Sequence, residues 1–252
     1  MKKFVVGDIH GAYKALIQCL ERSGFNKEKD QLITLGDIAD GWSEVPKVVD
    51  ELLTIPNRID IRGNHDWWLN DWLQNGIAPH YWLEQGGQAS MDAYISLMDD
   101  PMDKYTGTIE RHKKFFNNQH YYYLDDDNRL FVHGGLNWHI DIKQNNKKEL
   151  MWDRHAFQAA CFWELEVMRN PTTKKNYFKD YKEVFVGHTA TNHGIWRLTQ
   201  GSLEPVNVSN MWNLDQGAGW DGKLTIMNVD TKEFWQSDLV SELYPEEKGR
   251  RG

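Results

Sequence analysis

The sequence is poor in cysteine and has no long apolar run. Its 252 residues include two cysteines, Cys19 and Cys161, which lie far apart and outside any C-x-x-C spacing. That usage argues against a disulfide framework and against a zinc ribbon. The apolar run after Lys2 and Lys3 is far shorter than the roughly 7–15 residues of a secretory signal, and no stretch of about 18 apolar residues predicts a membrane helix. We therefore expect a soluble, cytoplasmic protein with no membrane partner.

The chain also lacks a surplus of positive charge. Its formal net charge is −8, which argues against a basic surface that forms a stable nucleic-acid complex. A small nucleotide or a nucleic-acid end remains open as a substrate, because metal ions can reverse the sign of the field inside a cleft. The length fits one domain over residues 1–252.

Strand-like and helix-like segments alternate over the first third of the chain. Apolar strands are expected near 2–6, 31–35 and 58–62, with helices near 12–24 and 45–55, so the sequence predicts an α/β fold whose first strands are parallel. Residues 67–123 are rich in aromatics and predict a helical cap insertion. We expect Trp67, Trp68 and Trp72 to form the buried face of a cap helix; the alternative is that these aromatics line a substrate cleft. Further strands are expected at 129–135 and 183–188. A run of antiparallel strands is expected over 211–238, and residues 245–252 should be frayed.

Five short segments each follow an apolar strand and carry side chains that bind metals. They are Gly7-Asp8-Ile9-His10-Gly11, Gly36-Asp37-Ile38-Ala39-Asp40, Gly63-Asn64-His65-Asp66, His133-Gly134-Gly135 and Gly187-His188-Thr189. Ligands bind beyond the carboxyl ends of strands in open α/β sheets, so these side chains should converge there. Carboxylate, imidazole and amide ligands suit Mn, Fe, Zn or Ni better than Ca. The absence of thiolates argues against a structural zinc site. Two metals about 3.5–4 Å apart are a common device for attack on a phosphoryl group.

These segments, in this order and spacing, resemble the phosphoprotein phosphatase branch of the metallophosphoesterases. The likeness is to lambda-type and bacterial Ser/Thr phosphatases and to diadenosine tetraphosphatase-like enzymes, and it extends from Gly7 to about Thr225. It implies a calcineurin-like α/β sandwich of two mixed β-sheets flanked by helices. It also implies a set of site residues: Asp8 and His10 on the first metal, Asp37 bridging both metals, Asn64, His133 and His188 on the second metal, His65 as general acid paired with Asp40, and Arg154, Arg62 and Asn64 at the phosphate.

Two positions distinguish this chain within the wider class. Ala190 stands where many relatives have a second metal-binding histidine, which supports the phosphoprotein phosphatase branch. Gly41 stands where that branch usually has an arginine that grips the phosphate, so this clamp is missing or comes from elsewhere. The side chain of Arg154 matches a second phosphate-contacting arginine of the family. Arg62 is also present in the family pattern, but a structural ion-pair role is an equal alternative.

The resemblance implies hydrolysis of phosphate monoesters, in a phosphoprotein or a small phosphorylated compound, by a hydroxide held between two divalent metal ions. We expect Mn²⁺, with Fe, Zn or Ni as alternatives. The carboxylate of Asp40 is expected to raise the pKa of His65, which suits proton donation to the leaving group. The alternative function is a dinucleoside polyphosphate or nucleic-acid-end phosphohydrolase, suggested by Gly41 and the aromatic insertion. A third hypothesis is a binding module without catalysis. The sequence leaves the oligomeric state open.

Overall fold

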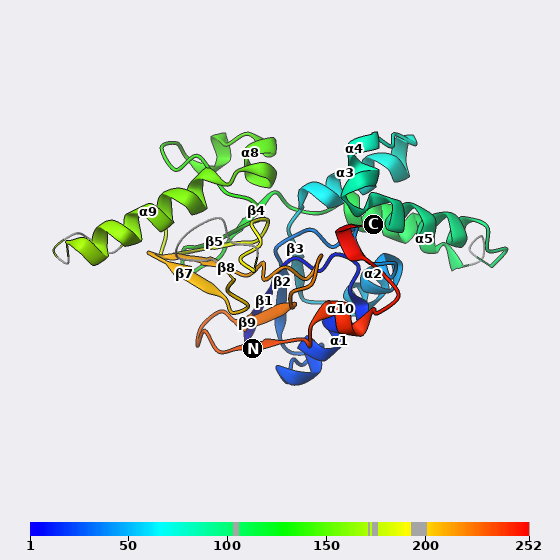
Figure 1. The fold of residues 1–252 in the computed structure, drawn as a ribbon, viewed down its shortest axis with the longest axis horizontal. Helices are drawn as coiled ribbons and strands as arrows, with labels where there is room; N and C mark the ends of the chain where they lie inside the picture. The colour runs from blue at the N-terminus through cyan, green and yellow to red at the C-terminus, as the bar shows by residue number, and fades with distance from the viewer. Residues whose placement is uncertain (103–105, 171, 173–175, 193–200, 252) are drawn as a thin grey trace.

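The computed structural model describes residues 1–102, 106–170, 172, 176–192 and 201–251. Two five-stranded sheets form the centre of the fold (Figure 1). The first has the order β10-β9-β1-β2-β3, and the second has the order β4-β5-β6-β8-β7. Their strands are β1 (Lys3–Val6), β2 (Gln31–Thr34), β3 (Arg58–Asp60), β9 (Thr225–Asn228) and β10 (Phe234–Gln236), and then β4 (Tyr122–Leu124), β5 (Arg129–Val132), β6 (Glu183–Val186), β7 (Val206–Val208) and β8 (Met211–Asn213).

Both sheets are mixed. β1 is parallel to β2 and β2 to β3, whereas β9 runs antiparallel to β1 and to β10. In the second sheet, β5, β6 and β8 are parallel, and β4 and β7 pair antiparallel at the edges. The prediction of parallel first strands is thus confirmed. The prediction of one antiparallel run over 211–238 is wrong for β8, because this strand pairs with β6 and β7 in the second sheet, while β9 and β10 belong to the first.

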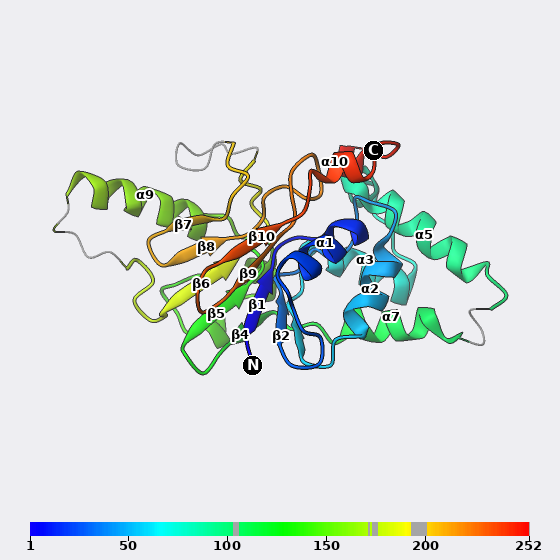
Figure 2. The same ribbon diagram turned by 90° about the horizontal axis from the view of Figure 1, so that it is seen from below.

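Alternating side chains of the central strands reach two different cores. Val5 of β1, Phe131 of β5 and Phe185 of β6 lie in the core between the sheets, and the Phe131 and Phe185 rings stack at 4.8 Å. Their neighbours Phe4 and Leu130 face the outer helices. The period of two along each strand therefore produces a sandwich with helices on both outer faces, as the fold prediction stated and as Figure 2 shows.

Helices cover the outer face of the first sheet and extend to one side of it. They are α1 (Tyr13–Arg22), α2 (Val45–Leu53), α3 (Asn64–Asn75), α4 (His80–Trp82), the π-helical turn η1 (Leu83–Gly87), α5 (Gln88–Met98) and α7 (Thr108–Asn117). The second sheet is covered by α9 (His155–Arg169), preceded by η2 (Ile142–Gln144) and α8 (Lys147–Trp152). The C-terminal part adds α10 (Val240–Leu243) and η3 (Gly249–Arg251). None of the helices in the described ranges is both long and apolar enough to cross a membrane.

The region 67–123 is mainly helical, but it shares its core with the first sheet. Leu69, Tyr94 and Phe116 pack in one cluster with Leu16 of α1 and Val48 of α2. This shared core leads us to propose a single domain over residues 1–252. The expectation for the tryptophans is met in part: Trp68 and Trp72 are half-buried and pack against this cluster. The fully buried apolar side chains of α3 are those of Leu69 and Leu73.

The C-terminal residues differ most from the expectation. They were predicted to be frayed, yet Gly249 is buried and Gly249–Arg251 form a 3-10 turn. The backbone N–H of Arg250 donates to the carbonyl of Gly219 at 2.9 Å. Acidic Glu247 accepts from both the backbone N–H and the hydroxyl of Ser43, each at 2.9 Å. These contacts fix the C-terminal segment against the loop that follows β2.

Candidate metal centre

All six predicted metal ligands lie together beyond the carboxyl ends of the central strands. The side-chain donor atoms of Asp8, His10 and Asp37 lie within 4.8 Å of one another, and so do those of Asp37, His133 and His188. The amide oxygen of Asn64 is 3.1 Å from Nε2 of His133. The two groups share Asp37, so the arrangement has the form of two adjacent ion sites joined by one carboxylate.

The backbone turns sharply at these ligands. Four site residues have positive φ: His10 (51°), Asp37 (48°), Asp40 (69°) and His188 (63°). A left-handed conformation costs a non-glycine residue roughly 1–2 kcal/mol. Strain of this kind persists where the surrounding structure enforces it, and it gathers at functional sites. These turns direct side chains from separate loops to one point.

Backbone carbonyls orient the imidazole rings. Nδ1 of His10 lies 3.0 Å from the carbonyl of Ala39, and Nδ1 of His133 lies 2.8 Å from the carbonyl of Leu35. In each ring Nδ1 therefore donates to a backbone carbonyl, and Nε2 faces the carboxylate of Asp37, at 3.7 Å in His10 and 3.3 Å in His133. His188 has the reverse arrangement, because its Nε2 lies 3.3 Å from the carbonyl of Trp152. Such outer contacts fix the tautomer of metal-binding histidines.

The charges of this cluster fit divalent cations. Asp8 is buried, and its Oδ1 has no hydrogen-bond partner among the residues that the structure describes. Burial, together with the nearby carboxylates of Asp215 and Asp37, raises the pKa of Asp8 well above its usual range. Burial also disfavours charge on Asp37, but the surrounding His133, His65 and His10 hold its pKa well below the usual range. An unpartnered buried carboxylate oxygen is costly unless a cation or donor meets it, and mixed oxygen and nitrogen donors suit Mn, Fe, Zn or Ni.

A carboxylate–imidazole pair lies beside the metal ligands. Oδ2 of Asp40 is 2.6 Å from Nδ1 of His65, and both residues are buried. The insertion supplies two further contacts to Asp40, since Trp82 donates its indole N–H to Oδ2 at 2.7 Å and Ser90 donates its hydroxyl to Oδ1 at 2.8 Å. The helical insertion thus fixes the orientation of the carboxylate that orients His65.

The protonation of this pair differs from the expectation. Burial raises the pKa of Asp40 to about 8. Burial and the positive charge of Arg250 hold the pKa of His65 well below its usual range, so the predicted rise of the His65 pKa is not met. Both shifts oppose a full ion pair, so Asp40 and His65 share one proton across their 2.6 Å hydrogen bond.

Asp66 is a positioning residue that the sequence reasoning did not assign. Its Oδ1 accepts from the backbone N–H groups of Ile38 and Ala39 at 2.8 and 3.0 Å. Its Oδ2 accepts from Gly63 N–H at 3.1 Å and from the Gln119 amide at 2.8 Å. Asp66 therefore joins the N-terminus of α3 to the loop that carries Asp37. An acidic residue at the third position of a helix is a signal for such capping.

A pocket of about 220 Å³ opens onto the metal ligands. It is lined by Asn64, His65, Trp68, Gln85, Trp152, Arg154, His188 and Arg250. The predicted phosphate ligand Arg154 is present here, with Nη2 3.5 Å from the carbonyl of His188. Arg250 also lines the pocket, and the sequence reasoning missed it because its segment was expected to be frayed.

The phosphate-binding role predicted for Arg62 is not supported. Arg62 is buried, and it does not line the pocket. Its guanidinium donates to the carbonyl of Phe116 and to the hydroxyl of Tyr121, and it lies 5.4 Å from the Tyr121 ring centroid. Among the described residues, Arg62 therefore has carbonyl, hydroxyl and ring partners in place of the expected ion pair, and its role at the phosphate stays a prediction.

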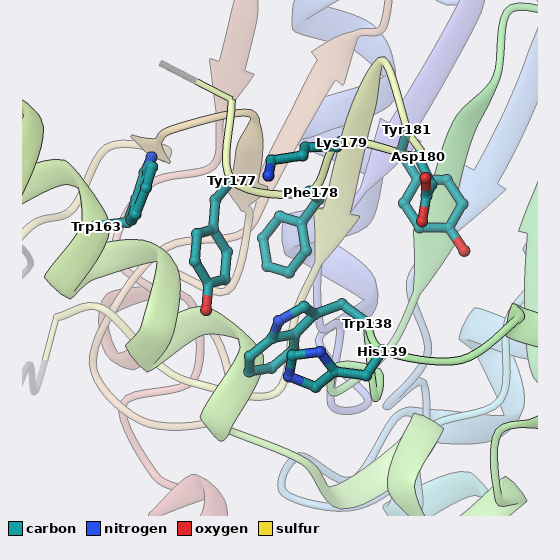
Figure 3. Close-up of a pocket in the computed structure, with 8 residues that line it drawn as sticks. All are labelled: Trp138, His139, Trp163, Tyr177, Phe178, Lys179, Asp180 and Tyr181. Atoms are coloured by element: carbon teal, nitrogen blue, oxygen red, sulfur yellow. The ribbon is translucent and has the colours of Figure 1, made fainter. Parts of the chain in front are cut away.

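Two aromatic cavities accompany this site. One, of about 360 Å³, is lined by Trp67, Trp68, Tyr81, Lys148 and Trp152. It adjoins the metal pocket, because Trp68 and Trp152 line both. The other, also about 360 Å³, contains none of the predicted site residues (Figure 3). Its lining consists of Trp138, His139, Trp163, Tyr177, Phe178, Lys179, Asp180 and Tyr181.

The chain is similar to known proteins in sequence and in fold. The family model described as calcineurin-like phosphoesterase matches residues 1–209. A solved structure of a metallophosphoesterase from Sphaerobacter thermophilus superposes with a TM-score of 0.54 at 15% identity, covering 97% of this chain and 95% of that chain.

Curated relatives include two kinds of phosphohydrolase. The symmetrical bis(5'-nucleosyl)-tetraphosphatase of Neisseria gonorrhoeae is 24% identical over 94% of this chain and 95% of its own length. The protein of the same name from Buchnera aphidicola is 33% identical, but the match covers 39% of this chain and 34% of that protein. Serine/threonine-protein phosphatase 2 of Escherichia coli is 33% identical over 40% of this chain and 45% of its own length.

Proposed function

Because the chain belongs to the calcineurin-like phosphoesterase family and is thus a phosphoric ester hydrolase with a divalent metal centre, we propose that it hydrolyses phosphate monoesters with two metal ions. The proposed ligands are Asp8, His10 and Asp37 for the first ion, and Asp37, Asn64, His133 and His188 for the second. The observation that carries this proposal is the pair of three-residue groups that share Asp37. We propose Mn²⁺, since the donors mix carboxylate, amide and imidazole.

Divalent ions at these positions supply activation of a water nucleophile and neutralisation of charge on the phosphoryl group. The protein's own contribution begins with orientation. Carbonyls of Ala39 and Leu35 fix the rings of His10 and His133, and Asp66 fixes the loop of Asp37. The ligand geometry is therefore set before substrate arrives.

His65 is the proposed general acid. Its Nδ1 is bonded to Asp40, which leaves Nε2 for the pocket that His65 lines. Donation of the Nε2 proton to the leaving oxygen is matched by transfer of the shared proton from Asp40 to Nδ1, so no full charge is left on the buried ring. Trp82 and Ser90 then stabilise the carboxylate that remains on Asp40.

The reaction is tested with a chromogenic aryl phosphate and a panel of divalent metals. We expect wild-type protein with Mn²⁺ to release the aryl alcohol, and Asp37→Asn to abolish release because both ion sites lose their shared ligand. The exposed Asp126 provides a matched control, and Asp126→Asn should retain full activity. A wild type that is inert with every metal would contradict the proposal.

A second substrate class, dinucleoside polyphosphates or nucleic-acid ends, is favoured by the tryptophan-lined cavity next to the metal pocket. The rings of Trp67 and Trp152 lie 5.0 Å apart, and those of Trp68 and Tyr81 lie 5.6 Å apart, in edge-to-face contact. Aromatic faces of this kind stack on nucleobases, each stacked base contributing about 1–3 kcal/mol. Lys148, near the face of Trp67 at 5.7 Å, adds positive charge for a second phosphate.

A side-by-side assay separates the two classes. The substrates are a phosphopeptide, a dinucleoside tetraphosphate and an oligonucleotide with a 3′-phosphate. If bases bind in this cavity, Trp67→Ala should lower kcat/KM for the nucleotide substrates about 5- to 150-fold, whereas Trp67→Phe, which keeps an aromatic face, should lose much less. A clear preference of the wild type for the phosphopeptide would remove the nucleotide hypothesis.

A further inference from the structure

The C-terminal segment is built into the wall of the metal pocket. Figure 1 shows its red end beside the helices of the insertion. The ring of Tyr244 stacks on buried Trp42 at 5.1 Å, and Glu247 binds Ser43 through two hydrogen bonds. The contacted residues Trp42 and Ser43 come directly after Gly41. The segment is thus anchored to the loop from which the expected phosphate-gripping side chain is missing.

The side chain of Arg250 occupies the room that this missing side chain leaves. A Cβ placed on Gly41 would lie 3.3 Å from Cγ of Arg250, and one placed on Gly86 would lie 3.2 Å from the same atom. A Cβ on Gly219 would lie 2.8 Å from Cδ of Arg250. Gly41 also has φ of +89°, a conformation that side-chain-bearing residues rarely adopt. Three glycines therefore form a narrow passage for the aliphatic stem of Arg250.

The guanidinium that emerges from this passage faces the metal ligands. Arg250 lines the same pocket as Asn64, Arg154 and His188. Its Nε donates to the carbonyl of Gln85 at 3.3 Å, and its plane lies 5.0 Å from the ring centroid of Trp220. The guanidinium of Arg250 is therefore placed in the same pocket as the proposed general acid His65 and the metal ligands Asn64 and His188.

Arg250 differs from the adjacent Arg251 in its partners. Arg251 is exposed and forms an ion pair with Asp221. In the described part of the chain, no carboxylate lies within ion-pair distance of Arg250. Its guanidinium instead lines the pocket together with a second one, that of Arg154. Two like charges held together around a pocket are stabilised when an anion lies between them.

We propose that Arg250 binds the non-bridging oxygens of the substrate phosphoryl group opposite Arg154, and so replaces the arginine absent at position 41. This inference rests on the proposed function, because it assigns the anion subsite of the same pocket. The family match ends at residue 209, so nothing in it assigns Arg250. The C-terminal segment thereby supplies a substrate-binding residue that the loop after β2 cannot.

The test compares Arg250→Ala, Arg250→Lys and the control Arg251→Ala. Inorganic phosphate is titrated calorimetrically into each Mn²⁺-loaded protein, and KM and kcat for an aryl phosphate are measured separately. Because Arg250→Ala removes charge-assisted hydrogen bonds to the phosphate, we expect this variant to bind phosphate about 10- to 100-fold more weakly. Arg250→Lys should lose less, because it keeps the charge but not the two-pronged donor geometry. Arg251→Ala should bind phosphate like the wild type.

The outcomes distinguish this inference from the reaction itself. Unchanged phosphate affinity in Arg250→Ala, or an equal loss in Arg251→Ala, overturns the inference, as does a wild type that binds no phosphate. A wild type that binds phosphate through Arg250 but hydrolyses no ester contradicts the proposed reaction and leaves the phosphate subsite supported. Melting temperatures show whether each variant is folded. If Arg250→Ala does not fold, the test rests on Arg250→Lys. A folded Arg250→Lys protein that binds phosphate as tightly as the wild type refutes the role of Arg250.

Discussion

Removal of the Asp66 side chain should cost more stability than almost any other single change outside the apolar cores. Asp66 is fully buried and accepts four hydrogen bonds, three of them from the backbone N–H groups of Ile38, Ala39 and Gly63. The fourth comes from Gln119. Asp66→Ala leaves these donors without their acceptor while they remain largely enclosed.

The magnitude follows from the number of donors. Each buried donor left unsatisfied costs about 1–3 kcal/mol, and water that enters the space left by the carboxylate recovers part of that cost. We therefore expect a loss of about 3–5 kcal/mol in the free energy of unfolding. For a chain of this length, that loss lowers the melting temperature by about 6–20 °C.

The assay is urea denaturation followed by tryptophan fluorescence, with chelator present so that metal binding does not contribute. Asp71 of the same helix provides the matched control, because its carboxylate accepts one exposed hydrogen bond from Asn75. Asp71→Ala should change the free energy of unfolding by no more than about 0.5 kcal/mol. If Asp66→Ala loses less than about 1 kcal/mol, or no more than Asp71→Ala, the argument that Asp66 holds the Asp37 loop is wrong.

Three further predictions concern the metal and the thiols. Mn²⁺ at about 100 times its Kd should stabilise the protein by about 2.7 kcal/mol, which raises the melting temperature by roughly 5–11 °C. The variant Asp37→Asn should lose this shift. An equal shift in that variant would mean that the metal binds elsewhere. Burial raises the pKa of both Cys19 and Cys161 to about 12. A thiol-specific reagent at pH 8 should therefore label native protein far more slowly than urea-unfolded protein. Rapid labelling of the native protein would contradict the burial of these thiols. Because the folded-state pKa is the higher one, the thiols' contribution to stability is complete below the unfolded pKa of about 8.5 and is lost as pH rises from there toward 12, which unfolding curves between pH 8 and 11 can measure.

The metal ligands could be predicted from the sequence because each depends on local information. An apolar strand that ends in glycine beside Asp, Asn or His identifies a ligand-bearing loop, and parallel strands bring such loops to one edge. The order of the blocks then resembles one family. Asp8, His10 and Asp37 required no knowledge of the helical insertion.

The supporting residues could not be predicted in the same way. Trp82 and Ser90 reach Asp40 from a helical region that has no strand pattern, and the stem of Arg250 packs against Gly41 across more than 200 residues of sequence. A short, polar, charged tail is usually frayed, and only tertiary contacts with Ser43, Trp42 and Gly219 distinguish this one. The direction of the Arg62 side chain could not be predicted either. Its place next to Gly63 gives no indication that its guanidinium donates to the carbonyl of Phe116.

The pairing of β1 with β9 has a consequence for synthesis on the ribosome. β1 ends at Val6, yet the strand on one of its two sides is formed by Thr225–Asn228. At about 5–20 residues per second, the nascent chain displays that open strand edge for roughly 10–45 seconds before its partner emerges. Unpaired edges of this kind promote association between chains. Co-translational chaperone binding near the N-terminus should therefore influence the yield of folded protein, and slowing translation should increase the protein's dependence on it.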